Sequence, residues 1–441
     1  MFEGIKSEIS GIHTVPVNGP GGIEMSLNET PRGVRVHIAL FGKRNAGKSS
    51  VINAITGQET AIVSEVEGTT TDPVFKSMEI LPIGPCVMID TAGIDDVGKL
   101  GELRIKKTLE VLDIADVALL IVDVKKGISD DDRLILDKFK EKKKPIIVVL
   151  NKIDTLENDD HQRIAPSLKE TLNEILNIPV VAMSALKKQG IKELKNAIIS
   201  VISEDEDKFK IVGDLINAGD FVVLVTPIDT AAPKGRLILP QQQTIRDILE
   251  SDAIAIVTKE YELRETLSNL AKKPKLVITD SQVFLKVAAD TPKDILMTSF
   301  SILFARQKGD LTEFIKGAKA IETLKDGDKI LIAEGCTHHK QSDDIGSVKI
   351  PRWIRQRTGK QLEFEFSAGA TFTDDIKKYA LIVHCGACMM NRTGMLSRIE
   401  RANHHHVPIV NYGILIAYVQ GLLPRALEPF PLAKMILEED L

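Results

Sequence analysis

Five side chains that can bind a metal fall in two short segments of this chain, namely Cys336 and His338, then His384, Cys385 and Cys388. The chain has only four cysteines, and three of them lie here. The C-x-x-C spacing of Cys385 and Cys388 lets two thiolates bind one metal centre, and thiolates select zinc or an iron–sulfur cluster. The residues allow a structural zinc site, a redox-active dithiol or a three-cysteine cluster with one open iron position. We favour the cluster.

A second set of residues is typical of phosphate binding. Residues 42–49 read G-x-x-x-x-G-K-S and follow an apolar segment, 34–41, which we predict to be a strand. The glycines let backbone N–H groups face phosphate oxygens, Lys48 reaches the β and γ phosphates, and Ser49 offers a hydroxyl to Mg²⁺. We expect the phosphates to be bound by Gly42, Asn45, Ala46, Gly47, Lys48, Ser49 and Ser50.

A third motif, Asp-Thr-Ala-Gly at 90–93, follows the strand predicted over 85–89. In this position Asp90 can hold Mg²⁺ through water, and the N–H of Gly93 can face the γ-phosphate. Together with the phosphate loop, these residues predict a site for a nucleoside triphosphate and its magnesium ion.

The base is read by two motifs that also follow predicted strands, over 145–150 and 179–183. The carboxylate of Asp154 accepts two N–H bonds from the guanine edge, which adenine cannot offer, so the nucleotide is GTP. Because the motifs occur in order at strand ends, they predict an α/β domain with a doubly wound parallel sheet. The residues that we expect around the base are Asn151, Lys152, Asp154, Ser184 and Ala185.

This region resembles the TrmE/Era group of GTPases. The segment 68–72 is similar to the group's switch I, with Thr70 placed to reach Mg²⁺, and Asn45 stands where TrmE-like enzymes help to bind K⁺. Ile94 replaces the usual water-positioning glutamine, and Glu102 stands at the spacing of the glutamate that TrmE-like enzymes use. Asp95, Asp96 and Glu102 are the candidates for positioning the water. The resemblance implies slow intrinsic hydrolysis. The residues that we expect to act in it are Lys48, Asp90, Gly93 and Glu102.

Length and charge limit the remaining choices. A chain of 441 residues is too long for one core, so we expect two or three domains. A net charge of -5 and a pI of about 6.1 give no general attraction to nucleic acid or to anionic membranes. The sequence shows no membrane-spanning run and no signal-peptide layout. We therefore predict a cytoplasmic protein, in which reduced thiols are available for metal.

Elements in the second half must position the cysteines. A strand predicted over 329–333 leads to Cys336, and one over 379–383 leads to His384 and Cys385. Ligands just beyond the carboxyl ends of two strands are well placed to converge. The other elements that we predict are strands over 220–226, 253–258 and 276–279, which carry no catalytic residues, and helices over 244–250, 298–306 and 311–321.

A P-loop GTPase region joined to C-x-H and H-C-x-x-C motifs resembles the HydF family of FeFe-hydrogenase maturation GTPases. The segments 231–236, 298–306 and 384–389 are similar to the signatures of that family. The resemblance covers nearly the whole chain from Val34 onward. It implies a GTPase domain followed by two further α/β domains, with boundaries that we predict at 1–33 for a flexible arm, 34–203 for GTP binding, 204–275 for homodimerisation and 276–441 for cluster binding.

The same resemblance implies a 4Fe-4S cluster on Cys336, Cys385 and Cys388. HydF-like proteins are scaffolds that receive a di-iron unit from two radical-SAM maturases and deliver it to the apo-hydrogenase. Three thiolates leave the fourth iron to a weaker or exchangeable ligand. That ligand is His338, His384, Asp343 or a group from outside the chain.

A nucleic-acid-directed GTPase is the main alternative. Such a protein would act in tRNA modification or ribosome assembly and would carry a structural zinc domain in its second half. The acidic net charge and the lack of basic stretches interleaved with aromatic residues argue against it.

Overall fold

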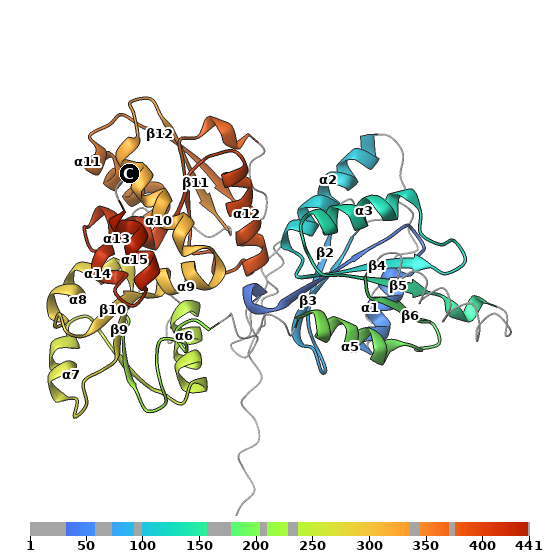
Figure 1. Cartoon of the computed structure of the whole chain (residues 1–441), viewed down its shortest axis with the longest axis horizontal. Helices are drawn as coiled ribbons and strands as arrows, with labels where there is room; N and C mark the ends of the chain where they lie inside the picture. Colours follow the sequence, from blue (N-terminus) through green and yellow to red (C-terminus); the bar gives the residue numbers. More distant parts are fainter. Residues whose placement is uncertain are drawn as a thin grey trace, which may run out of the picture. The chain divides into compact units, whose positions relative to one another are not determined.

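The computed structural model describes residues 32–57, 73–91, 99–156, 178–202, 210–227, 237–335, 344–369 and 375–439, with only the backbone for 32 and 99–106. Within these ranges three β-sheets form, in chain order (Figure 1). The first has the strand order β2-β3-β1-β4-β5-β6, and only β2 is antiparallel to its neighbour. Its strands are β1 (Val36–Phe41), β2 (Val74–Ile80), β3 (Gly84–Asp90), β4 (Val117–Asp123), β5 (Ile146–Asn151) and β6 (Val180–Ala182).

Helices cover both faces of this sheet, which explains why its parallel strands β1, β4 and β5 are nearly continuous apolar runs. Alternate residues of β1 enter different cores, because successive side chains of a strand point to opposite faces. Ile38 and Leu40 face one core, and Ala39 and Phe41 face the other. The helices are α1 (Lys48–Thr56) and α5 (Ile191–Ile202) on the first face, and α2 (Lys99–Ile114) and α3 (Asp130–Glu141) on the second (Figure 1).

The predicted doubly wound P-loop domain is therefore confirmed. β1 lies between β3 and β4, so the order of the strands reverses at β1. Sheets of this type bind ligands in the crevice at such a switch point. The fourth cysteine, Cys86, lies fully buried in β3, and burial raises the pKa of its thiol to about 11. It belongs to the core.

The second sheet is parallel throughout, with the order β10-β9-β7-β8. A short 3₁₀ helix, η4 (Ser281–Val283), follows β9. Its strands and helices are β7 (Phe221–Val225), α6 (Leu239–Glu250), β8 (Ile254–Thr258), α7 (Leu263–Asn269), β9 (Leu276–Thr279), α8 (Phe284–Asp290), β10 (Leu296–Ser299) and α9 (Phe300–Lys308).

This sheet corrects the boundary predicted at 275. A cut there would separate β9, and β10 beside it, from β7, the strand with which β9 pairs, so the division falls after α9. The helix predicted over 298–306 also begins later, because Thr298 and Ser299 end β10. Ser299 caps α9, and its Oγ accepts the N–H of Ile302 at 3.2 Å. A four-residue buried strand is too short to reveal a period, and this is why the sequence did not show it.

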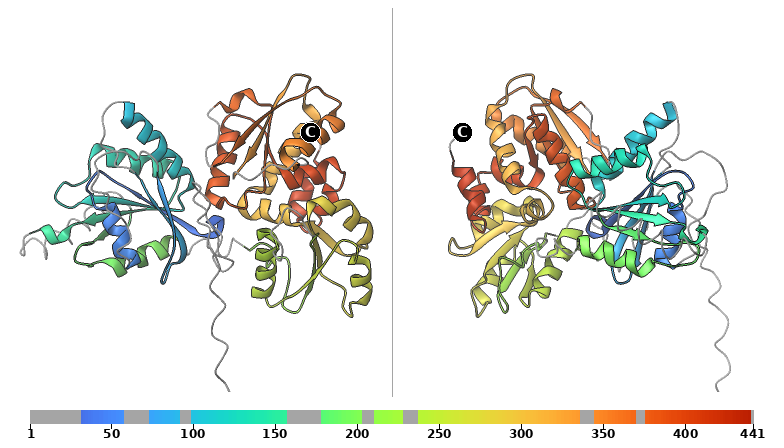
Figure 2. Two further views of the ribbon diagram at one scale, coloured as in Figure 1. Left: turned by 180° about the vertical axis from the view of Figure 1, so that it is seen from behind. Right: turned by 45° about the vertical axis from the view of Figure 1, so that its right-hand side comes forward.

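The third sheet is also parallel, with the order β12-β11-β13-β14. The two helices α10 and α13 contact each other, and α10 packs on β14 (Figure 2). The elements of this part are α10 (Leu311–Lys319), β11 (Lys329–Glu334), α11 (Ile350–Thr358), β12 (Glu363–Ala368), β13 (Leu381–His384), α12 (Arg392–His404), β14 (Ile409–Asn411), α13 (Tyr412–Val419), α14 (Leu423–Ala426) and α15 (Pro431–Glu438).

One continuous cluster of buried residues includes both the second and the third sheet. Two further α/β domains are thus confirmed, but they share a core. Among the helices of the described ranges, none has the length and apolar character needed to span a bilayer.

Candidate nucleotide and metal sites

The P-loop connects the carboxyl end of β1 to α1 through three residues with positive φ, at 136° for Gly42, 62° for Asn45 and 97° for Gly47. A Cβ atom on Gly42 would lie 2.3 Å from the carbonyl oxygen of Ile121, and one on Gly47 would lie 2.3 Å from Nδ2 of Asn151. Both positions therefore require glycine for space as well as for conformation. Ala46 is buried and Ser50 is exposed.

The predicted magnesium ligands meet beside this loop. Ser49 Oγ donates to Asp90 Oδ2 at 2.9 Å, across the gap between α1 and the end of β3. The ammonium group of Lys48 donates to the carbonyl oxygens of Gly42 at 2.8 Å and Lys43 at 3.0 Å. The Lys48 ammonium and the Asp90 carboxylate therefore lie where the motif predicts a phosphate and its Mg²⁺ ion.

Three predicted catalytic or magnesium-binding groups cannot be placed. Thr70 and Gly93 lie outside the described residues, and Glu102 lies in α2 where only the backbone is described. Their roles stay predictions.

The guanine motifs are tied to the P-loop by Asn151. Its Nδ2 donates to the carbonyl oxygen of Ala46 at 3.0 Å, and its Oδ1 accepts the N–H of Ala185 at 3.1 Å. Lys152 Nζ reaches the carbonyl oxygen of Asn45 at 2.6 Å. The hydroxyl of the fully buried Ser184 donates to Asp154. All five predicted base-binding residues therefore belong to one network at the edge of the sheet.

A further residue of this network, Asp123 at the end of β4, is absent from the sequence motifs. Its Oδ2 accepts from Lys152 Nζ at 2.9 Å and fixes the lysine that crosses the P-loop. Burial would raise the pKa of Asp123, but the hydrogen bond from Lys152 holds it below the ordinary value. Its position directly after the apolar run 117–122 is the one signal that could have identified it.

The carboxyl ends of β11 and β13 meet as predicted, because the two strands are neighbours in register, with Ala333 opposite His384. The N–H of Gly335, the residue before Cys336, donates to Cys385 Sγ at 3.1 Å. Burial raises the pKa of the Cys385 thiol, and the N–H groups of Gly335 and Ala387 oppose that effect. Such N–H donors are the partners that a thiolate requires.

Both ring nitrogens of His384 have partners inside the protein. The residue is fully buried, its Nδ1 lies 2.8 Å from the carbonyl oxygen of Cys385, and its Nε2 lies 2.7 Å from the guanidinium group of Arg398. Burial and the charge of Arg398 lower the pKa of His384 to about 3, so the ring is neutral. The role of His384 as a ligand stays a prediction, and in this conformation it would require one of these partners to move.

Two buried cations, which the sequence analysis missed, surround the C-x-x-C segment. Lys308, at the end of α9, donates to the carbonyl oxygens of Ala387 and Cys388 at 3.0 Å and of Met390 at 2.9 Å. Burial lowers the pKa of Lys308 to about 8, and that of Arg398 to about 10. Lys308 lies far from the cysteines in sequence, so no motif could have linked them.

Within the described ranges, no group of three or more His, Cys, Asp and Glu side chains is arranged to hold a metal ion. Cys336, His338 and Asp343 lie outside those ranges, so the predicted set is only partly visible. The visible part supplies two thiols at one strand end, with N–H donors and cations beside them.

Comparison with known families covers most of the chain. Residues 37–152 match the family model "50S ribosome-binding GTPase". Residues 211–309 match "Hydrogen maturase F dimerization domain", and residues 312–429 match "Hydrogen maturase F tetramerization domain". The division between the last two agrees with the end of the second sheet and not with a boundary at 275.

Individual relatives match less than half of this chain. A GTPase Der of Mycoplasmopsis pulmonis is 37% identical over 187 residues, 41% of this chain and 43% of that protein. A tRNA modification GTPase MnmE of Moorella thermoacetica is 36% identical over 169 residues, 37% of this chain and 34% of that protein. The chain thus spans less than half the length of these relatives. A solved structure of Aquifex aeolicus Era bound to GDP.AlF4- is 24% identical, with a TM-score of 0.34, and the match covers 50% of this chain and 91% of that one.

The two hydrogen maturase F matches are contiguous and include both sheets of the second half, with the C-x-x-C segment inside the second match. The GTPase match precedes them in the order that the sequence predicts. The chain belongs to the hydrogen maturase F family, and its GTPase domain lies on the N-terminal side of the two hydrogen maturase F domains.

Proposed function

We propose that this protein is a GTP-hydrolysing iron–sulfur scaffold, which assembles or carries the di-iron precursor of the FeFe-hydrogenase active site. In this proposal it receives the precursor from two radical-SAM maturases and delivers it to the apo-hydrogenase in the cytoplasm. The observation that carries the proposal is the meeting of β11 and β13, which brings Cys385 beside the residue that precedes Cys336. The family match supplies the context of hydrogenase maturation.

The donor set fits a 4Fe-4S cluster. Cys336, Cys385 and Cys388 would hold it, while Lys308 and Arg398 supply positive charge next to the anionic thiolates. The bound cluster would supply one iron with an exchangeable position for the incoming precursor. Gly335 and Ala387 orient the Cys385 sulfur through their N–H groups.

The first domain would bind GTP and Mg²⁺ through its P-loop and guanine motifs. Ser49 and Asp90 would hold Mg²⁺, Lys48 would turn from the loop carbonyls to the phosphates, and Asp154 would select guanine.

Changing Asp154→Asn is expected to shift nucleotide preference from GTP toward XTP, because the new amide donates where the carboxylate accepted. Two hydrogen bonds to a charged group contribute about 1.5–3 kcal/mol each, so GTP affinity should fall roughly a hundredfold or more. Equilibrium titrations of the full chain with both nucleotides measure it. The control is Asp137→Asn, an exposed residue of α3. Equal affinity of the wild type for ATP and GTP would contradict the assignment.

Hydrolysis is expected to be faster in K⁺ than in Na⁺ at matched ionic strength, because Asn45 stands where TrmE-like enzymes bind K⁺. We expect a difference of roughly tenfold or more, a small part of the 10³–10⁵ that an arginine finger supplies. Rates of phosphate release in the two salts test it, and Asn45→Ala should remove the difference. Equal wild-type rates would reject K⁺ and leave the GTPase assignment intact.

We expect a homodimer through the second sheet. Its outer strand β8 exposes Ile254 and Val257, at 44% and 45% of their surface, and an apolar edge strand is a template for pairing with a second chain. Val257→Lys should reduce the mass measured by light scattering. Leu249→Lys should not, although Leu249 is an exposed apolar residue of α6. An unchanged dimer in Val257→Lys would argue for a different interface.

Metal analysis of anaerobically purified protein tests the proposed function against its alternative. The scaffold should contain iron and sulfide in equal amounts. Zinc without sulfide would favour a TrmE/Era-like GTPase for tRNA modification or ribosome assembly with a structural zinc domain. Absence of any metal, with two reactive thiols, would favour the dithiol reading.

A further inference from the structure

Asp116 connects the GTPase domain to the segment that follows the C-x-x-C motif. It lies between α2 and β4, at the amino edge of the first sheet. Its Oδ2 accepts the N–H of His37 in β1 at 2.8 Å. Its Oδ1 accepts Asn391 Nδ2 at 3.0 Å and also the Thr393 hydroxyl. Burial would raise the pKa of Asp116, but the hydrogen bonds from His37 and Thr393 keep it below the ordinary value, so the group is a carboxylate.

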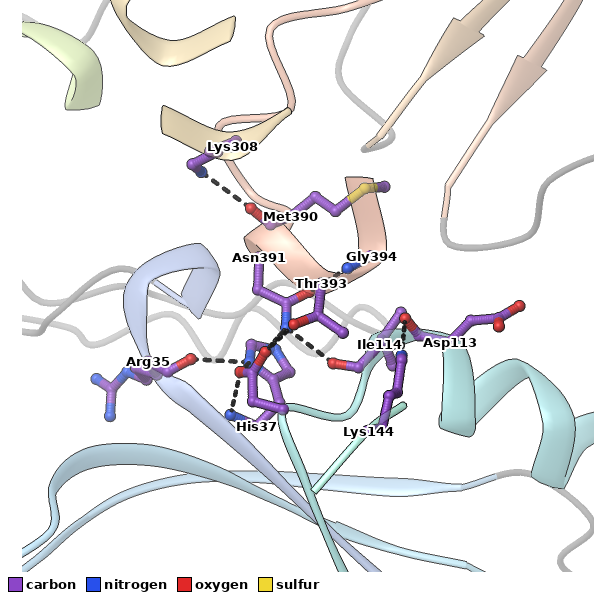
Figure 3. Close-up of polar contacts among 11 residues, drawn as sticks. Arg35, His37, Asp113, Ile114, Lys144, Lys308, Met390, Asn391, Thr393 and Gly394 are labelled. Carbon is purple, nitrogen blue, oxygen red and sulfur yellow. Dashed lines mark hydrogen bonds and ion pairs between the residues drawn. The ribbon is translucent and has the colours of Figure 1, made fainter. Parts of the chain in front are cut away.

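Asn391 acts on both sides of this contact. Its Oδ1 caps α12 by accepting the N–H of Gly394 at 3.2 Å. Its Nδ2 donates to the carbonyl oxygen of Ile114 at 2.8 Å, at the last residue of α2 (Figure 3). A movement of the end of α2 therefore acts directly on the start of α12, three residues after Cys388.

The C-x-x-C segment itself is held between the two domains. A Cβ atom on Gly33 would lie 2.7 Å from the carbonyl oxygen of Cys388 and 2.8 Å from that of Met390, so the backbone that leads into β1 packs directly on it. Lys308 donates to the same two carbonyl oxygens, and Figure 3 shows its hydrogen bond to the one of Met390. The segment has little room to adapt independently, because interiors this close-packed transmit displacement.

Helix α2 follows the segment after the motif at 90–93 and leads to the amino edge of the GTPase sheet. It begins at Lys99 and ends at Ile114, two residues before Asp116, whose N–H donates to the carbonyl oxygen of His37 in β1 at 2.9 Å. Its 16 residues give a length of roughly 24 Å. In GTPases the γ-phosphate fixes the segment after this motif, and hydrolysis releases it. The helix that follows that segment is thus the element most directly biased by the nucleotide.

We propose that the contact made by Asp116, Asn391 and Thr393, called the α2–α12 junction below, transmits the nucleotide state of the P-loop site to the C-x-x-C segment. Since coupling between two sites is reciprocal, a group bound at the cysteines changes the preference for GTP over GDP by the same factor. The inference rests on the nucleotide binding proposed above but not on the cluster.

Hydrogen exchange of the full chain tests the junction. With Mg²⁺ and either GDP or a non-hydrolysable GTP analogue, the backbone amides of residues 385–395 should exchange at rates that differ by about fivefold or more between the two nucleotides, the lower end of allosteric coupling. In Asn391→Asp this difference should disappear. The variant keeps the oxygen that caps α12, but it puts a second carboxylate beside Asp116 and the Ile114 carbonyl.

Asp113→Asn is the matched control. Asp113 lies one residue before Ile114 on α2, but its side chain pairs with Lys142 and not with α12, so the difference should remain. Thr393→Val, which removes a single hydroxyl, gives a second test if Asn391→Asp folds poorly, and it should at least halve the difference.

Protection of residues 42–50 by either nucleotide shows that the P-loop site is filled. With that protection present, equal exchange of 385–395 in the two states of the wild type would overturn the inference. A full difference in both junction variants would also overturn it. If neither nucleotide protects 42–50, the proposed function fails and the inference fails with it. A chain that lacks iron and sulfide but keeps the difference supports the junction while rejecting the scaffold.

Discussion

Cys385→Ala protein, purified without oxygen, is expected to contain almost no iron or sulfide, whereas the wild type should carry about four of each per chain. Cys385 lies at the carboxyl end of β13, and its sulfur accepts the N–H of Gly335 from the neighbouring strand end. Two remaining thiolates would leave two irons of a cubane without a protein ligand. Iron and acid-labile sulfide assays, with the visible absorption spectrum, measure the loss.

GTP turnover should survive this change. The hydrogen bonds of the nucleotide site join residues of the first domain to one another, for example Ser49 to Asp90 and Asn151 to Ala185. Cys86→Ala is the matched control, since this thiol is buried in β3 and should not affect cluster content. A brown protein with full iron content in Cys385→Ala would overturn the ligand assignment. Zinc in place of iron in the wild type would indicate that the second half holds a structural zinc site.

The sequence was most informative where function depends on short, continuous motifs. The P-loop, Asp90 and the guanine motifs each follow a buried strand, and the structure brings them together because parallel strands end at one edge. The convergence of β11 and β13 could be predicted for the same reason. The role of Gly93 was predicted from its motif, and those of Thr70 and Glu102 from the resemblance to TrmE-like GTPases; all three stay predictions.

Features that depend on packing between distant segments could not be read from the sequence. His384 has the residue type and spacing of a ligand, yet burial beside Arg398 uses both of its nitrogens. We therefore expect His384→Ala to alter the surroundings of the cluster without abolishing it. The short strand β10 carries no period, so the sequence suggested a helix there. Lys308 is recognisable only from the three carbonyl oxygens that surround it.

The second large effect is expected for Lys308→Met. The side chain is only 4% exposed, and methionine matches its length without its donors. Three carbonyl oxygens of the C-x-x-C segment would lose their shared partner, and each buried acceptor left unsatisfied costs about 1–3 kcal/mol. The wild-type ammonium itself loses hydration on burial, which offsets part of that sum. We expect a net loss of about 2–4 kcal/mol in the stability of the C-terminal part.

Trp353, the single tryptophan of the chain, reports on this part because it lies in α11 and packs against the shared core. Urea unfolding followed by its fluorescence should show a lower midpoint for Lys308→Met. Lys316→Met, in which an exposed lysine paired with Glu313 is replaced, should change stability by no more than about 0.5 kcal/mol.

Cluster content separates two explanations of the Lys308→Met result. If Lys308 positions the carbonyl groups of Ala387 and Cys388, its loss frees a segment in which Ala387 has a φ of 52°, a conformation that non-glycine residues adopt only when the surroundings impose it. The thiol of Cys388 would then lose its fixed position, and iron content should fall along with stability. A variant that unfolds at the same urea concentration as Lys316→Met and keeps its full iron content would show that the ammonium neither stabilises nor positions this segment.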